Sequence, residues 1–376
     1  MKCNAIRAVD FRNIENAEVS FSDGVNLFLG DNAQGKTNLL EAVCFFSLGK
    51  SFRGAKENEF IRFGQKTAHL SLDFEDSQRE QNLTVDFQRD KTRTVTQNGV
   101  KITKMSEMIG VFRAVLFVPE HLNIIKEGPG MRRSYLDVAI SQLRPVYLRS
   151  LQKYNHVLSQ RNKLIKDAYE DRKSFDATVE FWSRELAHEA ALITKARLGY
   201  LAAAEKELSV CFSDMTGGKE IPGIRYESSF HIAPEDAYDV KKAEEAFFET
   251  LMSSHDREIA AGATLWGIHK DDMDLTLNGK SARLYGSQGQ QRSLALGLKI
   301  AESAISYAAT GEEPVLLFDD VFSELDASRR EYLVSRLHGR QVLMTACGDT
   351  ADVIAGKENV SIVRVTDGKY APEAVC

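Results

Sequence analysis

Hydrophobic and polar residues alternate in the first third of the chain, which is the pattern of strands with one buried face. The alternation covers residues 3–11 and 17–21 and returns over 67–102, where the Asn-Gly pair at 98–99 is a strong hairpin signal. Between these regions a short apolar stretch predicts a strand, and helical periodicity follows over about 38–48. The first third is therefore predicted to be rich in strands, with one early helix.

The middle of the chain changes to helical periodicity, over 131–170 and again over 177–212. A strand over 224–231 and a helix over about 240–258 are predicted next. Because no heptad pattern persists, the periodicity favours a compact helical lobe or short arm over a long coiled coil.

The last part of the chain returns to short strands and turns. A second Asn-Gly pair, at 278–279, predicts another hairpin, and the apolar run at 314–318 predicts a buried strand. The other short elements expected are strands at 113–118, 341–345 and 360–365, and helices at about 290–308 and 327–337.

The composition is that of a globular protein. With 376 residues, 43% hydrophobic and 27% charged, the chain exceeds what one core usually organises, so two or three lobes are expected. No apolar run of about 18 residues is present and the first residues lack an apolar signal core, so neither a membrane span nor secretion is expected. The five cysteines form no C-x-x-C pair, which indicates neither a zinc site nor a disulfide framework and fits a cytoplasmic location.

Charge is unevenly distributed along the chain. The formal net charge of −6 argues weakly against a polyanionic partner, but eight basic residues lie between 131 and 166, opposed only by Asp137. They form either a solvated helix face or a patch that contacts phosphates, and the sequence leaves both open. The eight are Arg132, Arg133, Arg144, Arg149, Lys153, Arg161, Lys163 and Lys166.

Residues 30–37 match the phosphate-binding loop G-x-x-x-x-G-K-S/T in full. The glycines permit backbone angles that a Cβ would block, and loop amides at a helix N-terminus favour an anion. Lys36 is predicted to reach the β- and γ-phosphates of ATP, and Thr37 to bind Mg²⁺. The alternative, an ordinary glycine-rich turn, is disfavoured by the strand and helix on either side. The predicted nucleotide-binding residues of this loop are Gly30, Asp31, Asn32, Ala33, Gln34, Gly35, Lys36 and Thr37.

Two carboxylates follow the apolar run at 314–318, as in a Walker B element. Asp319 is predicted to hold Mg²⁺, and Asp320 to orient the attacking water as a catalytic residue together with Lys36. An Asp-Asp turn after a core strand is the simpler interpretation in isolation, but a phosphate-binding loop requires such a partner.

A second anion site is predicted at the start of the helix near residue 290. The hydroxyl of Ser287 and the amides of Gly289 and Gln290 suit an anion at a helix N-terminus, although a plain helix cap is the alternative. Because one ATP needs no second phosphate site within the same chain, use in trans by another copy of the chain is the economical interpretation.

The order of these motifs resembles the ABC-type ATPases that act on DNA, the SMC, Rad50 and RecF group, and most closely the RecF family. The short insertion excludes the long-armed relatives. The stretches that carry the resemblance are FRNIENAEVSF (11–21), GDNAQGKTNLLEA (30–42), GKSFR (49–53), FVPEHL (117–122), KEGPGMRRSYLD (126–137), GIHKDD (267–272), GSQGQQRSLALGLKIAE (286–302) and LLFDDVFSELD (316–326).

The resemblance implies an α/β fold, an ABC-type ATPase head with a mixed sheet around the P-loop and an inserted compact α-helical lobe. The implied domains are an N-terminal part of the ATPase domain (1–125), a mostly helical insertion (126–260) and a C-terminal part with signature, Walker B and D-loop (261–376). It also implies that Arg12, Asn13 and Arg53 lie near the nucleotide. Further implied roles are a signature motif at 287–290 on a partner's ATP, a D-loop at 323–326, and paired basic residues Arg132 and Arg133.

The chain departs from the pattern at several positions. Gln288 replaces a signature glycine. Asp320 stands where many relatives have glutamate, and because aspartate is one methylene shorter its contact with water is harder to make, so slow hydrolysis is expected. In the Gly-Ile-His-Lys-Asp-Asp stretch, His269 has either a structural role or a contact with nucleotide or DNA. Glu120 occupies roughly the place of the transporter Q-loop glutamine, and no switch histidine is found near Thr345.

The expected function is ATP-dependent DNA binding in recombinational repair and replication (gap repair and the SOS response), with weak DNA-stimulated ATPase activity. The implied partners are single-stranded, double-stranded or gapped DNA, a second copy of the chain that dimerises on ATP, and RecO- and RecR-type mediators, with no membrane. Three rivals are an ABC transporter ATPase subunit, a P-loop kinase or ligase, and a DNA-end nuclease; no metal-ligand array supports the last.

Overall fold

The computed structural model describes residues 1–230, 232–233, 235–347 and 359–373, which form two compact units. The first unit combines Met1–Asn123 with Ala295–Cys376, and the second is Ile124–Leu294. The second unit is thus inserted in the sequence of the first. The three predicted domain segments, 1–125, 126–260 and 261–376, stay a prediction.

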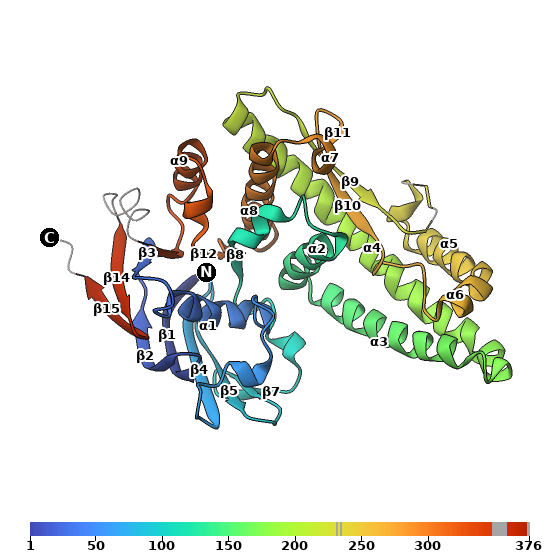
Figure 1. Ribbon diagram of the computed structural model, residues 1–376, viewed down its shortest axis with the longest axis horizontal. Coiled ribbons are helices and arrows are strands. Elements are labelled where there is room, and N and C mark those ends of the chain that lie inside the picture. Colours follow the sequence, from blue (N-terminus) through green and yellow to red (C-terminus); the bar gives the residue numbers. More distant parts are fainter. Residues whose placement is uncertain (231, 234, 348–358, 374–376) are drawn as a thin grey trace. The chain divides into compact units, whose positions relative to one another are not determined.

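The first unit contains an antiparallel sheet built from the alternating N-terminal segments (Figure 1). Its spatial order is β2-β1-β4-β5-β6-β7. The predicted hairpin is confirmed, because Asn98 and Gly99 both have positive φ angles and join β6 to β7. The strands are β1 (Lys2–Phe11), β2 (Ile14–Ser20), β4 (Thr67–Glu75), β5 (Glu80–Gln88), β6 (Thr94–Gln97) and β7 (Val100–Ile102).

A second, mixed sheet of the first unit has the order β15-β14-β3-β13-β12-β8, parallel except for β15. Strands β8, β12 and β13 are buried at every residue, as expected for strands covered on both faces. Strand β15 was not predicted from the sequence, since Lys369–Glu373 is short and mostly exposed. The strands are β3 (Val25–Leu29), β8 (Ala114–Phe117), β12 (Val315–Asp319), β13 (Val342–Ala346), β14 (Val360–Thr366) and β15 (Lys369–Glu373).

Helix α1 (Lys36–Leu48) packs against strands of both sheets and is buried on nearly all its surface. It begins at Gly35 and ends at Gly49, two glycines with positive φ. Aromatic rings from α1 and the antiparallel sheet form its core, with Phe45 lying 5.2 Å from Phe87 between centroids. The other helices are η1 (Glu57–Glu59), η2 (Met105–Glu107), η3 (Pro119–Asn123), η5 (Val321–Glu324), α8 (Gln288–Thr310) and α9 (Ala327–Arg336). Helix α8 contains the boundary between the two units, which lies between Leu294 and Ala295.

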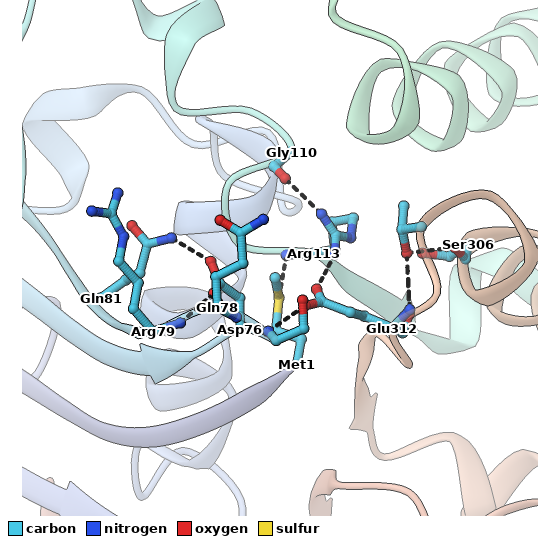
Figure 2. Close-up of polar contacts among 11 residues, drawn as sticks. Met1, Asp76, Gln78, Arg79, Gln81, Gly110, Arg113, Ser306 and Glu312 are labelled. Atoms are coloured by element: carbon cyan, nitrogen blue, oxygen red, sulfur yellow. Dashed lines mark hydrogen bonds and ion pairs between the residues drawn. The ribbon is translucent and has the colours of Figure 1, made fainter.

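An ion pair ties the two chain segments of the first unit together (Figure 2). The Arg113 guanidinium contacts the carboxylate of Glu312, which also accepts a 2.5 Å hydrogen bond from the Ser77 N–H. Burial of the Glu312 carboxyl opposes its ionisation, but the bonds from Ser77 and the charge of Arg113 outweigh this and lower its pKa. The stabilisation from this pair is therefore present above the ordinary glutamate pKa and is lost as the pH falls through the lowered value.

The second unit is mostly helical, and its 45-residue helix α4 runs beside α3 and α5 (Figure 1). The Asp171 side chain caps α4 at one end and Gly217, with positive φ, ends it. A small antiparallel sheet of order β11-β10-β9 contains the second predicted hairpin, at 278–279. The elements are α2 (Pro129–Leu143), α3 (Pro145–Asp167), α4 (Arg172–Thr216), β9 (Pro222–Glu227), η4 (Asp236–Tyr238), α5 (Val240–Ser253), α6 (His255–Ala261), β10 (Asp272–Leu277), β11 (Lys280–Ser281) and α7 (Ala282–Tyr285).

Candidate nucleotide-binding site

The predicted phosphate-binding loop lies between β3 and α1 in the first unit. Gly30 must be glycine, because a Cβ there would lie 2.3 Å from the carbonyl oxygen of Val365. Gly35 has φ +111°, and a Cβ there would lie 3.0 Å from Asn13 Oδ1. The Gly368 N–H donates a hydrogen bond to the carbonyl oxygen of Gln34, so the turn between β14 and β15 stabilises the loop.

Lys36 folds back over this loop. Its Nζ donates to the carbonyl oxygens of Gly30 (2.5 Å) and Asp31 (2.8 Å) and lies 3.5 Å from Cys347 Sγ. Only 7% of the residue is exposed, so its charge depends on these carbonyls for solvation. Phosphate oxygens of a bound nucleotide are stronger acceptors for the same ammonium group.

Thr37 and Asp319 meet at the end of the parallel sheet. Thr37 Oγ1 donates to Asp319 Oδ1 at 2.9 Å, and Thr345 Oγ1 donates to the same oxygen at 2.8 Å. Burial raises the pKa of Asp319, and the two hydroxyl bonds partly counter that rise. An aliphatic hydroxyl and a carboxylate are oxygen donors of the kind Mg²⁺ prefers, so the pair fits that ion.

Asp320 lies in the left-handed region, with φ 51° and ψ 26°, which aspartate tolerates better than most residues. Its N–H donates to Thr345 Oγ1 at 3.0 Å, and its carbonyl accepts from Ser323 Oγ. Burial raises the pKa of the Asp320 carboxyl, partly offset by the charge of Lys36. The Thr345 hydroxyl therefore connects the Asp319 carboxylate with the Asp320 backbone N–H, a role that the sequence did not reveal.

Replacing Thr345 with valine is expected to slow ATP hydrolysis about tenfold or more, because the variant keeps the shape but leaves the Asp320 N–H without its acceptor. Phosphate release under single-turnover conditions measures the effect, with ATP binding measured beside it. Thr345→Ser keeps the hydroxyl and should restore the rate. Unchanged hydrolysis by Thr345→Val would show that the hydroxyl does not position Asp320.

The residues predicted near the nucleotide from the first hairpin lie on one side of the loop. The Arg12 guanidinium pairs with both carboxylate oxygens of the buried Glu41, at 2.8 and 2.9 Å. Asn13 Oδ1 accepts from Asn38, whose own side-chain oxygen accepts from Arg53 at 3.2 Å. Arg12 is thus held by α1, while Asn13 and Arg53 share a polar chain through Asn38.

Most of the predicted nucleotide-binding residues of the first unit line one cavity of about 850 Å³. The structure therefore brings together Arg12, Asn13, Arg53, Asp320 and the loop residues from Asp31 to Thr37, whereas Gly30 and Asp319 are not among the lining residues. It adds others that no sequence motif indicated, because they come from loops and strand ends far apart in the chain. The added lining residues are Asn38, Asn58, Glu59, Ile61, Phe63, Arg89, Thr345 and Cys347.

The predicted signature motif belongs to the second unit and forms a reciprocal cap at the start of α8. Ser287 Oγ accepts from the Gln290 N–H at 3.2 Å, and Gln290 Oε1 accepts from the Ser287 N–H at 2.8 Å. The Gln290 side chain also donates to Glu220. Ser287 and Gln288 are exposed. Ser287 and Gln290 thus form a helix cap and Ser287 is accessible on the surface, while contact with ATP of another copy stays a prediction.

His269 is part of an internal network of the second unit. Its Nδ1 lies 2.7 Å from the Tyr154 hydroxyl and its Nε2 lies 3.2 Å from the Thr264 carbonyl oxygen. Burial lowers its pKa to about 4, so the ring is neutral at pH 7. Both ring nitrogens thus have internal partners, which fits the structural role, while Lys270 is exposed.

The run of basic residues between 131 and 166 does not form one continuous face. Arg132 pairs with Asp272, Arg161 with Glu258, and Lys153 with two glutamates of α4. The exposed members are Arg144, Arg149, Lys153, Lys163 and Lys166. The count of basic residues therefore overstates the charge available to a phosphate backbone.

Three remaining predicted positions belong to short connections of the first unit. Glu120 is exposed in η3, directly after β8. Ser323 lies in η5, and Asp326 caps α9 through the Arg329 N–H. The predicted D-loop thus runs from within η5 to the N-cap residue of α9.

Comparison with known proteins decides the family. A family model described as RecF/RecN/SMC N terminal domain matches residues 2–369. The chain belongs to this RecF/RecN/SMC family. DNA replication and repair protein RecF of Lachnospira eligens is 36% identical over 99% of the chain and 100% of the relative. RecF of Ruminiclostridium cellulolyticum is 38% identical over 89% of the chain and 90% of that relative.

Solved RecF structures confirm the predicted fold class. The recombination mediator protein RecF of the RecFOR pathway, solved as RecF-ATPrS, superposes with a TM-score of 0.91 at 34% identity, covering 99% of this chain and 98% of that one. An Smc head domain from Pyrococcus furiosus, at 16% identity and a TM-score of 0.57, shares the fold alone. Within the described residues, no helix has the length and apolar character needed to span a bilayer.

Proposed function

We propose that the chain is an ATP-dependent DNA-binding protein of replication and recombinational repair, acting in the cytoplasm. The RecF relatives are named for replication and repair, and one of the similar solved structures is RecF-ATP. The observations that carry the ATP-dependent part are the large cavity lined by Lys36 and Thr37 and the hydrogen bond from Thr37 Oγ1 to Asp319. That arrangement suits a nucleoside triphosphate with its magnesium ion.

Each group of the cavity has a distinct task with ATP. Lys36 holds the terminal phosphates, and the loop amides solvate the remaining charge. Thr37 and Asp319 would hold Mg²⁺, which offsets the negative charge of the phosphates when bound. Asp320 orients water, and its short side chain favours slow turnover. Slow hydrolysis suits a protein whose bound state lasts long enough to mark a site on DNA.

Ser287–Gln290 is proposed to contact ATP held by the P-loop of a second copy of the chain. Two nucleotides would then lie in a two-fold symmetric dimer, each buried by the partner's α8 N-terminus. The dimer would hold DNA mainly through phosphates, so binding should weaken steeply with salt and show little sequence preference. RecO- and RecR-type mediators are the proposed protein partners, and single-stranded, duplex or gapped DNA the nucleic-acid ones.

Analytical ultracentrifugation with ATP, with ADP and without nucleotide tests this function. ATP should produce a dimer that a gapped duplex stabilises, and ADP should not. Ser287→Arg should keep ATP binding, because Ser287 belongs to the other unit, but should abolish the dimer by placing a bulky side chain at the contact.

Ser209→Arg is the matched control, since Ser209 is an exposed serine on α4. It should dimerise like the unmodified chain. A dimer that forms equally well in Ser287→Arg would refute the in-trans site.

The transporter interpretation is not favoured, because the similar proteins are replication and repair proteins rather than transport subunits. A P-loop kinase or ligase has no use for a second helix N-terminal site, so ATP-dependent dimerisation separates it from our proposal. The described residues contain no group of three or more His, Cys, Asp or Glu placed to hold a metal ion. The absence of nuclease activity stays a prediction.

A further inference from the structure

Phe63 is more exposed than any other large hydrophobic side chain in the described part of the chain. It is 100% exposed, and it lines the same cavity as the phosphate-binding loop. Its chain neighbours Phe60 and Ile61 are buried in the core. A solvent-facing benzyl ring beside a ligand cavity offers apolar surface that a ligand can cover.

The backbone presents Phe63 on a fixed turn. Gln65 donates its N–H to the Arg62 carbonyl oxygen at 3.0 Å, and Gly64 provides the positive φ of 84°. The Arg62 guanidinium pairs with Asp10 at 2.7 Å, and the Arg62 N–H bonds to the Asp10 carbonyl. The turn is therefore anchored to β1, and the exposure of Phe63 is set by the fold.

The rest of the cavity lining divides by chemistry. The loop, Lys36 and the Walker B residues supply charge and amides suited to phosphates. Phe63 and Arg89 instead offer an exposed aromatic ring and a planar guanidinium. Such groups suit a flat heterocycle, because a base stacks on aromatic and guanidinium planes.

We propose that Phe63 stacks on the base of the nucleotide whose phosphates occupy the P-loop. The inference rests on the proposed ATP binding and adds the residue that recognises the base. Every nucleobase has a π-face on which an aromatic ring can stack. Phe63 should therefore discriminate strongly between a nucleotide and a bare polyphosphate, and only weakly between adenine and guanine nucleotides. Arg89, whose side chain donates a hydrogen bond to the Gln65 carbonyl oxygen at 3.4 Å, also lines the cavity and offers a second planar group to the base.

Binding of Mg·ATP and of inorganic tripolyphosphate to the full chain tests the proposal. Phe63→Ala should weaken ATP binding about 5- to 150-fold, the range expected for losing one stacked base, and leave tripolyphosphate binding unchanged. Phe63→Trp should keep ATP affinity, and ATP, but not tripolyphosphate, should quench its new indole fluorescence. Folding is not at risk, because the side chain packs against no core.

Phe181→Ala is the matched control, since Phe181 is 60% exposed and belongs to the second unit. It should bind both ligands normally. Unchanged ATP affinity in Phe63→Ala, or no ATP-dependent quenching in Phe63→Trp, would overturn the stacking role. If the unmodified chain binds no ATP, the proposed function itself fails, an outcome that is distinct from a defect confined to Phe63 variants.

Discussion

Lys36→Ala is expected to weaken ATP binding at least about 100-fold. The ammonium group makes charge-assisted hydrogen bonds to phosphate oxygens, each of about 1.5–3 kcal/mol, and two of them account for this loss. The other cationic residues that line the cavity, Arg12, Arg53 and Arg89, lie outside the phosphate-binding loop and therefore cannot replace Lys36 within it. Isothermal titration with a non-hydrolysed ATP analogue measures the change.

A control is needed because Lys36 also holds the carbonyls of Gly30 and Asp31 without nucleotide. Thermal unfolding of the nucleotide-free variant shows whether the loop alone is affected, and Lys36→Arg tests charge without the lysine geometry. If Lys36→Ala folds normally and still binds ATP with near-normal affinity, the nucleotide site lies elsewhere.

Glu258→Ala should lower the free energy of unfolding by about 3–5 kcal/mol, the usual cost of leaving one partner of a buried ion pair uncompensated. Arg161 and Glu258 are both 0% exposed and pair at 2.6 Å. The remaining guanidinium nitrogens donate to Ser183 and Thr264, so the charge cannot turn toward water. Urea unfolding followed by circular dichroism measures the loss.

The double variant Arg161→Met with Glu258→Leu separates charge from packing. Because it removes both charges, it should recover much of the stability lost in Glu258→Ala. The exposed pair of Arg184 and Glu180 is the matched control, and Glu180→Ala should cost only about 0.3–0.5 kcal/mol. A Glu258→Ala effect as small as that of Glu180→Ala would show that water reaches the buried pair.

The sequence was most informative where the chemistry is local. The phosphate-binding loop is eight consecutive residues whose glycines, lysine and threonine each have one geometric task, and the two Asn-Gly hairpins need only positive φ at adjacent residues. The run of apolar residues before Asp319 likewise predicts a buried strand, which is observed as β12. Pattern and position therefore predicted these elements with nearly the observed boundaries.

Contacts between distant residues could not be predicted in this way. Arg132 pairs with Asp272, and Arg161 with Glu258, so the basic count gave a misleading picture of the surface. Nothing in the sequence indicated that Thr345 belongs to the site, since a threonine at the end of a strand is common. Its hydroxyl contacts Asp319 and Asp320 only because β13 pairs with β12. No motif in the sequence indicated Phe63, because only the fold places this residue in the cavity lining.

The order of strands in the mixed sheet has a consequence for how the protein is made. β3 carries the phosphate-binding loop, but its two neighbours in the sheet, β13 and β14, are translated only after residue 340. During synthesis the antiparallel sheet and the helical unit can form first, whereas β3 lacks both neighbouring strands until the end of translation. A ribosome-released fragment would therefore carry the loop sequence without the strands that shape it, and the capacity to hold nucleotide arises only when the final strands have been added.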